Sequence, residues 1–188
     1  MGRVTAGRRT TARLIAKATH SIPTHTVMPK AIYRVPAAVN EPTKSYLPGS
    51  PERKELQAML RELRAKEVDI PMYIGDREVR GETRIRLAPP HDHRHTLGYF
   101  HKSEKSHVTE AIEAALAAKA AWTAMRWEMR ASIFLKAAEL IAGPYRAELN
   151  AATMLGQSKN VFQAEIDSAC EIVDFLRFNV QPVLIARS

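Results

Sequence analysis

Three histidines alternate with other residues in the sequence His-Asp-His-Arg-His at positions 91–95. Alternate residues of an extended strand project to the same side, so these imidazoles could bind a transition metal. Arg94 adds a positive charge that opposes a metal cation, and the proline pair at 89–90 is typical of an irregular loop. The segment therefore favours a solvated polar loop, and we predict no metal-binding residue in this chain.

Cys170 is the only cysteine, and it could in principle act as a thiolate nucleophile. It falls on the apolar face of a predicted helix, and no histidine follows it to serve as a nearby base. We therefore predict a buried structural cysteine. A single cysteine also excludes a disulfide framework and a zinc site with several thiolates from one chain.

Asp167, Glu171 and Asp174 fall at i, i+4 and i+7, which aligns three carboxylates along one helix face. Such a stripe is usually a solvated surface. The functional alternative is that one carboxylate lines a pocket and pairs with a cationic group of a substrate. The spacing is compatible with both interpretations.

The first elements that must position these residues are a helix and a small β region. Ser50 and the proline after it are typical of a helix N-terminus, and the leucines that follow at helical spacing predict a helix over 51–67. Gly75-Asp76 predicts a hairpin turn within 68–87, and one further strand is predicted to begin at 98–100.

From residue 106 onward the chain is predicted to be almost wholly helical. Four helices are predicted in this part. The first begins at Ser106 as its cap, the second spans 127–142, and the third follows and ends at Gly156. The fourth spans 159–178, with Ser158 as its cap. The side chains expected to share buried faces are Val108, Ile112 and Leu116, then Ile133 and Leu140, then Ile166, Cys170, Val173 and Leu176.

Charge is distributed unevenly along the 188 residues, which hold 28 Lys and Arg against 20 Asp and Glu. Residues 1–40 hold seven of the bases and no acid, whereas residues 41–188 are nearly neutral. This composition is typical of a mitochondrial presequence, and we predict one over residues 1–35. A nucleic-acid-binding arm and a plain disordered tail are the alternatives.

Two further function classes find no support in the residues. No stretch approaches the roughly 18 uninterrupted apolar residues of a transmembrane helix, so we predict no membrane span. No glycine-rich loop of the dinucleotide or Walker type is present, so no cofactor-binding residue is predicted from the sequence pattern.

Five phrases occur in order along the body of the chain. They are Val-Asn-Glu-Pro at 39–42, Gly-Ser-Pro-Glu-Arg at 49–53, Ala-Ile-Glu-Ala-Ala-Leu-Ala-Ala at 111–118, Ile-Phe-Leu-Lys-Ala-Ala at 133–138, and Gln-Ala-Glu-Ile-Asp at 163–167 continuing to Phe178-Asn179. Together they resemble the N-terminal part of an aldehyde dehydrogenase over about residues 39–179. The resemblance implies an α/β aldehyde dehydrogenase fold, of which residues 36–179 would be an incomplete, mostly helical portion with a small β-hairpin region.

The resemblance also implies NAD-dependent oxidation of L-glutamate γ-semialdehyde to L-glutamate, during proline degradation in the mitochondrial matrix. In this family a cysteine thiolate attacks the aldehyde, hydride passes to NAD, and a carboxylate activates the water that hydrolyses the thioester. Glu171 matches a position whose carboxylate lies near the substrate amino group, so the resemblance implies that Glu171 binds substrate. It further implies a small-molecule substrate and a homo-oligomer, with no nucleic-acid or membrane partner.

The family's nucleophilic cysteine, general-base glutamate and NAD-binding segments have no counterpart in residues 39–179, and residues 180–188 diverge from the family pattern. We therefore expect a fragment of the dehydrogenase that has no catalytic or cofactor-binding residue and no activity alone. The alternative is a non-catalytic truncated isoform that acts as a helical interaction module. Either way, helices made to pack on an absent sheet would expose apolar faces.

Overall fold

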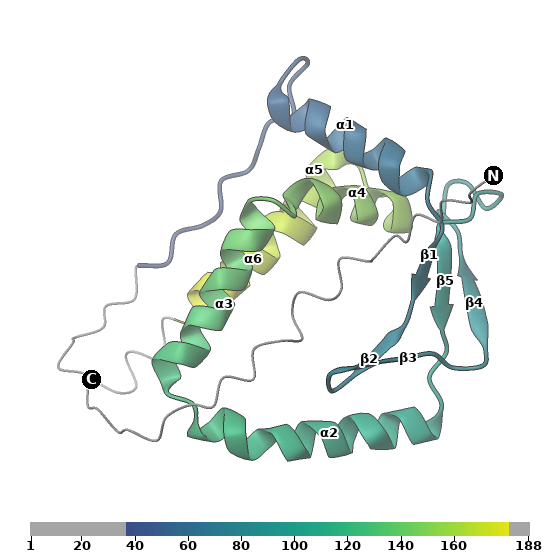
Figure 1. Ribbon diagram of the computed structural model, residues 1–188. Helices are drawn as coiled ribbons and strands as arrows, with labels where there is room; N and C mark the ends of the chain where they lie inside the picture. Colours follow the sequence, from purple (N-terminus) through teal and green to yellow (C-terminus); the bar gives the residue numbers. More distant parts are fainter. Residues whose placement is uncertain (1–36, 181–188) are drawn as a thin grey trace, which may run out of the picture. The chain divides into compact units, whose positions relative to one another are not determined.

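The computed structural model describes residues 37–180, and within them the chain is mostly helical with two small sheets (Figure 1). The predicted presequence over 1–35 and residues 181–188 lie outside the described residues. No helix in the described part is long and apolar enough to cross a membrane.

Five short strands follow the first helix: β1 (Val68–Ile70), β2 (Met72–Ile74), β3 (Arg77–Val79), β4 (Arg84–Leu87) and β5 (Gly98–His101). β2 and β3 form the predicted hairpin, and Gly75 in its turn has φ +63°, a conformation that glycine adopts without strain. β5 pairs in parallel with β1 and antiparallel with β4 in a three-stranded sheet.

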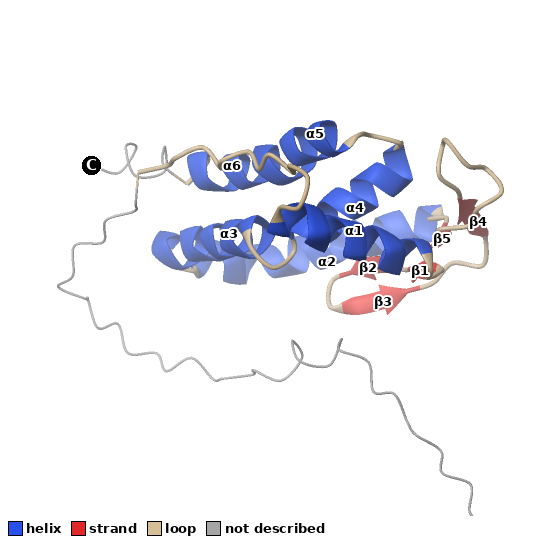
Figure 2. Ribbon diagram, turned by 90° about the horizontal axis from the view of Figure 1, so that it is seen from above, coloured by secondary structure: helices blue, strands red, loops and turns tan. Residues whose placement is uncertain are grey.

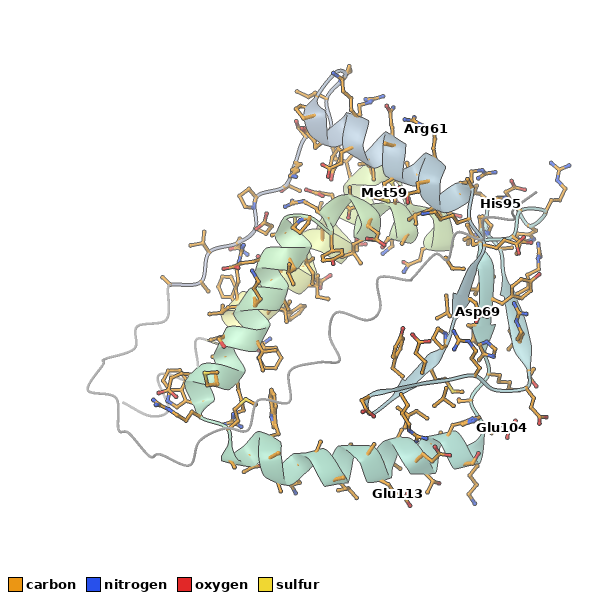
Figure 3. The ribbon with its side chains drawn as sticks, in the orientation of Figure 1. Met59, Arg61, Asp69, His95, Glu104 and Glu113 are labelled. Atoms are coloured by element: carbon orange, nitrogen blue, oxygen red, sulfur yellow. The ribbon has the colours of Figure 1, made fainter. Side chains whose placement is uncertain are left out.

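The first helix, α1 (Pro51–Arg64), begins where the sequence predicts. The Ser50 side chain accepts a hydrogen bond from the Arg53 amide at 3.4 Å, as an N-cap does. The helix ends three residues before the predicted boundary at 67, because the chain must turn there to enter β1 at once. Figure 3 shows Met59 on the side of α1 that faces α4 and Arg61 on the other side.

A small apolar core joins α1 to α4 (Arg146–Gln157). Its buried members are Tyr46, Leu56 and Ala151, and partly buried leucine and methionine side chains of both helices pack around them. This contact ties the segment before α1, residues 37–46, to helices that follow it by about a hundred residues. We call residues 37–46 the leading segment.

The long helix α2 (Lys105–Ala124) begins one residue before the predicted cap, so Ser106 lies inside it. Glu104 occupies the N-cap position, and its backbone amide donates to Nδ1 of His107 at 3.0 Å. No residue of α2 is buried, and its predicted apolar face is exposed: Val108, Ile112 and Leu116.

The boundaries predicted for the next helix, α3 (Trp127–Ala142), are confirmed. Its predicted buried face is wrong in part, because Ile133 and Leu140 are exposed while the small side chains of Ala131 and Ala138 are buried. α3 and α6 lie side by side (Figure 2).

The predicted helix over 159–178 is three consecutive segments: α5 (Val161–Ala164), the π-helical segment η2 (Glu165–Cys170) and α6 (Glu171–Phe178). Its cap is Asn160, whose side chain accepts from the Gln163 amide at 3.0 Å. Ser158, the predicted cap, instead ends α4 in a left-handed conformation with φ 57°.

The π turn decides which side chains of this region are buried. Ala164 and Ala169, like Glu165 and Cys170, are buried and five residues apart. Two residues five apart lie on nearly the same side of a π-helix, because its turn is wider. In an α-helix the same two residues lie about 140° apart around the axis. For the same reason Ile166, predicted to be buried from α-helical spacing, is exposed, while Cys170 and Val173 are buried as predicted.

Candidate functional site

The most deeply buried charges of the described residues are an ion pair between α4 and η2. Arg146 at the start of α4 is 2% exposed, and Glu165 at the start of η2 is 0% exposed. The guanidinium donates through Nε to Oε2 of Glu165 at 3.2 Å and through Nη2 to Oε1. This two-point geometry is the strong form of an arginine–carboxylate contact.

Neutral donors complete the hydrogen bonding of the Glu165 carboxylate. The backbone amide of Lys44, the Tyr46 hydroxyl and the Asn150 side chain each donate to it at 2.7 Å. Tyr46 has a left-handed backbone with φ 52°, which a non-glycine residue adopts only when its surroundings hold it. The carboxylate therefore links the leading segment, α4 and η2.

This bonding controls the protonation states within the site. Burial disfavours the ionised form of Glu165, but donation from Arg146 and the other partners outweighs it, so the pKa of this carboxyl lies below its ordinary value. Burial, and then the hydrogen bond to Glu165, raise the pKa of Tyr46. Glu165 is thus an ionised carboxylate paired with the Arg146 guanidinium, and the Tyr46 hydroxyl beside them is neutral.

A second set of contacts connects the leading segment to α6. Asp174 accepts from the side-chain nitrogen of Asn40 at 2.7 Å and from the Glu41 amide at 2.6 Å. The Glu41 carboxylate pairs with Arg177 at 2.8 Å and with Arg146. Glu41 therefore bridges α6 to the buried ion pair.

Glu171, the predicted substrate-binding residue, is the first residue of α6 and directly follows η2. Its side chain is exposed, and within the described residues it has no hydrogen bond or salt bridge. Its backbone amide donates to the Ile166 carbonyl, five residues earlier, which is the π-helical pattern. The carboxylate is thus available to a ligand and is placed by the π turn.

The predicted acidic stripe does not form one site. Asp167 pairs with Lys159 at 2.8 Å near the surface, and Asp174 is used by the leading segment. Glu171 remains the one carboxylate of the three without a partner in the part of the chain that the structure describes.

The histidine-rich segment 91–95 is a loop of turns, as predicted. Nδ1 of His91 lies 2.7 Å from the Ser158 hydroxyl, while Nε2 of His95 is buried without a hydrogen-bond partner in the described structure. Across residues 37–180 no group of three His, Cys, Asp or Glu side chains could hold a metal ion.

Cys170 is buried, which confirms the burial predicted for it. Burial and the nearby Glu165 carboxylate raise the pKa of its thiol, so the thiolate is disfavoured. Arg146, whose Nη2 lies 3.4 Å from the sulfur, acts to lower this pKa, but burial and Glu165 outweigh it. The thiol is therefore not an activated nucleophile.

A mainly apolar cavity of about 440 Å³ lies beside α3 and α6. Trp122 and Phe134, which contact edge to face at 6.4 Å between ring centroids, line it together with Trp127, Ile172 and Phe175. Glu171 is not among the lining residues. The cavity offers apolar contact area and no acid–base pair.

Sequence reasoning missed Arg146, Glu165 and Tyr46. The available signal lies in α4, where Arg146, Asn150 and Thr153 share helical spacing with buried alanines, so a polar stripe occupies an otherwise apolar face. A buried arginine requires a carboxylate partner, but the spacing does not reveal which one.

Comparison with known proteins relates this chain to one family. The family model described as "Aldehyde dehydrogenase family" matches residues 77–183, more than half of the chain. The chain is 48% identical over 154 residues to delta-1-pyrroline-5-carboxylate dehydrogenase of Agaricus bisporus, covering 81% of this chain and 28% of the relative. It is 46% identical over 142 residues to the human mitochondrial enzyme of that name, covering 76% and 25%.

Solved structures show the same fold over this region. The delta-pyrroline-5-carboxylate dehydrogenase of Mycobacterium tuberculosis bound with NAD and cobalamin superposes with a TM-score of 0.78 at 47% identity, covering 80% of this chain and 29% of that one. An NAD-bound 1-pyrroline-5-carboxylate dehydrogenase from Thermus gives a TM-score of 0.71 at 28% identity, covering 84% and 29%.

The matched part of the chain spans about a quarter of the length of these curated relatives. The described part accordingly has the fold of a portion of these enzymes, mostly helical with small sheets, as expected from the sequence. The family match over residues 77–183 and the shared fold lead to one conclusion. This chain belongs to the aldehyde dehydrogenase family.

Proposed function

We propose that these residues are the N-terminal portion of a dehydrogenase that oxidises L-glutamate γ-semialdehyde to L-glutamate with NAD in proline degradation. The observation that carries the proposal is 48% identity over 154 residues to a delta-1-pyrroline-5-carboxylate dehydrogenase. NAD use is supported by neighbours of that activity solved with NAD bound.

Within this reaction we assign substrate binding to Glu171. The substrate carries an α-ammonium group, and a carboxylate with no partner in the described residues is its natural acceptor. Residues 37–180 hold no glycine-rich phosphate loop, and their buried thiol is disfavoured as a thiolate. We therefore place NAD binding and the chemical steps in the larger part of the complete enzyme, and propose that residues 1–188 alone are inactive.

We further propose that the complete protein works in the mitochondrial matrix as a homo-oligomer. The acid-free, basic residues 1–35 support import, and relatives at 46% identity from human and cattle carry "mitochondrial" in their names. An antibody raised against residues 51–179 tests this on fractionated mitochondria. In the matrix fraction we expect a band whose mass is far above that of a 188-residue chain. A band only at the mass of 188 residues contradicts the proposal.

The role of Glu171 is tested in the complete dehydrogenase by Glu171→Gln. Loss of one charged hydrogen bond is expected to lower kcat/KM for L-glutamate γ-semialdehyde roughly 10- to 100-fold. Glutarate semialdehyde, the same chain without the amino group, should be oxidised at a nearly unchanged kcat/KM. Steady-state NADH formation measures both.

The matched control is Asp167→Asn, which removes a surface carboxylate from the same region. It pairs with Lys159 and has no assigned contact with substrate, so both aldehydes should react as with the wild type. Equal losses for both aldehydes in Glu171→Gln would contradict amino-group recognition. NADH formation by the purified 188-residue chain would contradict its proposed inactivity.

A further inference from the structure

We propose that the buried Arg146–Glu165 pair is a positioning device that holds the π turn of η2 and thereby directs the Glu171 carboxylate. This inference rests on the substrate-binding role proposed for Glu171. Arg146 and Glu165 are 2% and 0% exposed, so neither can touch the substrate itself in the described structure. Their influence must pass through the backbone.

The first observation is that Arg146 contacts both ends of the π segment. Its guanidinium binds the carboxylate of Glu165, the first residue of η2, and lies 3.4 Å from the sulfur of Cys170, the last residue. These two residues are five apart, so they face one guanidinium only while the turn is π-helical. In an α-helix they would diverge by about 140°.

The second observation is that Glu171 is joined directly to this turn. Its amide donates to the Ile166 carbonyl, the last hydrogen bond of the π pattern. The π turn holds one residue more than an α-helical turn, so if η2 relaxed to an α-helix the residues after it would shift by one position along the helix. Each residue advances an α-helix by about 100°, so Glu171 would turn away from its present direction by an angle of that order.

The third observation is that α6 has anchors of its own on the leading segment, in addition to its link to η2. Asp174 accepts from the Glu41 amide at 2.6 Å, and Arg177 pairs with the Glu41 carboxylate at 2.8 Å. Because α6 is fixed by the leading segment, a change in η2 cannot be absorbed by rotating the whole helix. It must appear at the junction, where Glu171 lies.

The π conformation itself needs this support. π turns are rare and occur mostly as single turns, frequently at functional sites. Here the cost is offset because the buried Glu165 carboxylate accepts from Arg146, Lys44, Tyr46 and Asn150, and it would lose these donors if it rotated outward. The site therefore stabilises the less common helical form next to the residue assigned to the substrate.

The test compares Glu165→Gln with wild type in the complete dehydrogenase, using L-glutamate γ-semialdehyde and glutarate semialdehyde. The salt bridge between Arg146 and Glu41 remains in this variant, which favours folding. We expect the ratio of the two kcat/KM values to fall about 5- to 10-fold, mostly through KM of the amino substrate. Oxidation of glutarate semialdehyde should keep its kcat.

A second readout follows the turn itself. Cys170 is buried, and mass-spectrometric mapping of its peptide after thiol labelling reports whether η2 has loosened. Labelling should be several-fold faster in Glu165→Gln than in wild type. The surface variant Asp167→Asn should change neither the labelling rate nor the substrate ratio.

The outcomes separate the two proposals. An unchanged substrate ratio in folded Glu165→Gln overturns the positioning role, whereas an unchanged ratio in Glu171→Gln overturns the proposed function of Glu171 instead. If Glu165→Gln does not fold, Tyr46→Phe decides, because it removes one donor to Glu165 and leaves the ion pair intact. A two- to three-fold fall in the ratio is then expected, and no fall overturns the inference.

Discussion

Glu165 is a fully buried carboxylate that remains ionised. Removal of such a group from water is costly unless a cation and several hydrogen bonds compensate. The structure supplies Arg146 and three neutral donors, so the ionised form is favoured and the pKa of Glu165 is lowered despite burial. Stability that depends on this group must therefore depend on pH.

The sign of that dependence follows from the lowered pKa. A carboxyl whose pKa is lower in the folded than in the unfolded protein stabilises the fold above its ordinary pKa of 4.5, and this stability is lost as pH falls through the folded value. We expect Glu165→Gln to melt well below wild type at pH 7 and the difference to shrink progressively as pH falls below 4.5. Thermal melts across this range, followed by circular dichroism, measure the difference. A constant difference at all pH values would contradict the ionised state of Glu165.

At this scale the sequence predicted the burial of Cys170 but not the ion pair beside it. Cys170 lies in a locally apolar pattern, so its burial can be read from neighbours. Arg146 and Glu165 are 19 residues apart, and Tyr46 lies 119 residues from Glu165. Pairing at such separations is decided by tertiary packing, which helical periodicity does not report.

At the junction of β1 and β5 there is no space for a side chain at Gly98. Gly98 has φ +153°, and a Cβ placed on it would lie 2.1 Å from the Val68 carbonyl oxygen. Gly98 is also the register partner of Val68 in the parallel pair. The position requires glycine both for its backbone conformation and for the close approach of the two strands.

We expect Gly98→Ala to separate β1 from β5 at a cost of about 3 kcal/mol in local stability, from backbone strain and overpacking together. Amide hydrogen exchange of the Val68 and Tyr99 peptides measures the loss. Gly156→Ala is the matched control, because its new methyl group has no atom within 4 Å apart from its chain neighbours and its own helix backbone. Gly156 also lies in α4, where alanine is favoured by about 1 kcal/mol. Undiminished protection of β5 in Gly98→Ala would contradict this account.

The elements also show where prediction from sequence stops. The boundaries of α3 were predicted correctly because its ends carry strong local signals, Gly143 and Pro144 at the C-terminus among them. The helix over 159–178 was predicted in the right place, but its π turn was not. The buried spacing of five is a consequence of the Arg146 contacts, and those contacts are not local.

At the scale of the whole molecule, large apolar side chains remain exposed on several helices. Val108, Ile112 and Leu116 on α2 are 52–63% exposed, and Phe175 on α6 is 59% exposed. Exposed apolar surface of this extent is typical of an interface rather than of a free surface. The relatives are about three times as long as this chain, and the additional portion is the expected cover.

The purified 188-residue chain should therefore associate with itself. We expect light scattering after size exclusion to show oligomers whose mass rises with concentration, and a dye specific for apolar surface to bind. The double substitution Ile112→Glu and Leu116→Glu should reduce both effects, because it places charge on exposed positions that the described fold does not bury. A monomer that melts cooperatively would instead favour an independent interaction module.

The span of the buried network has a consequence for the order in which the protein is built. The leading segment emerges from the ribosome before its partners Glu165 and Asp174, which follow Lys44 and Glu41 by 121 and 133 residues. Contacts this distant in sequence are slow to form and cannot exist until the partners are synthesised. Residues 37–46 are therefore without these native contacts until η2 and α6 have been synthesised, and until then this stretch is accessible to chaperones.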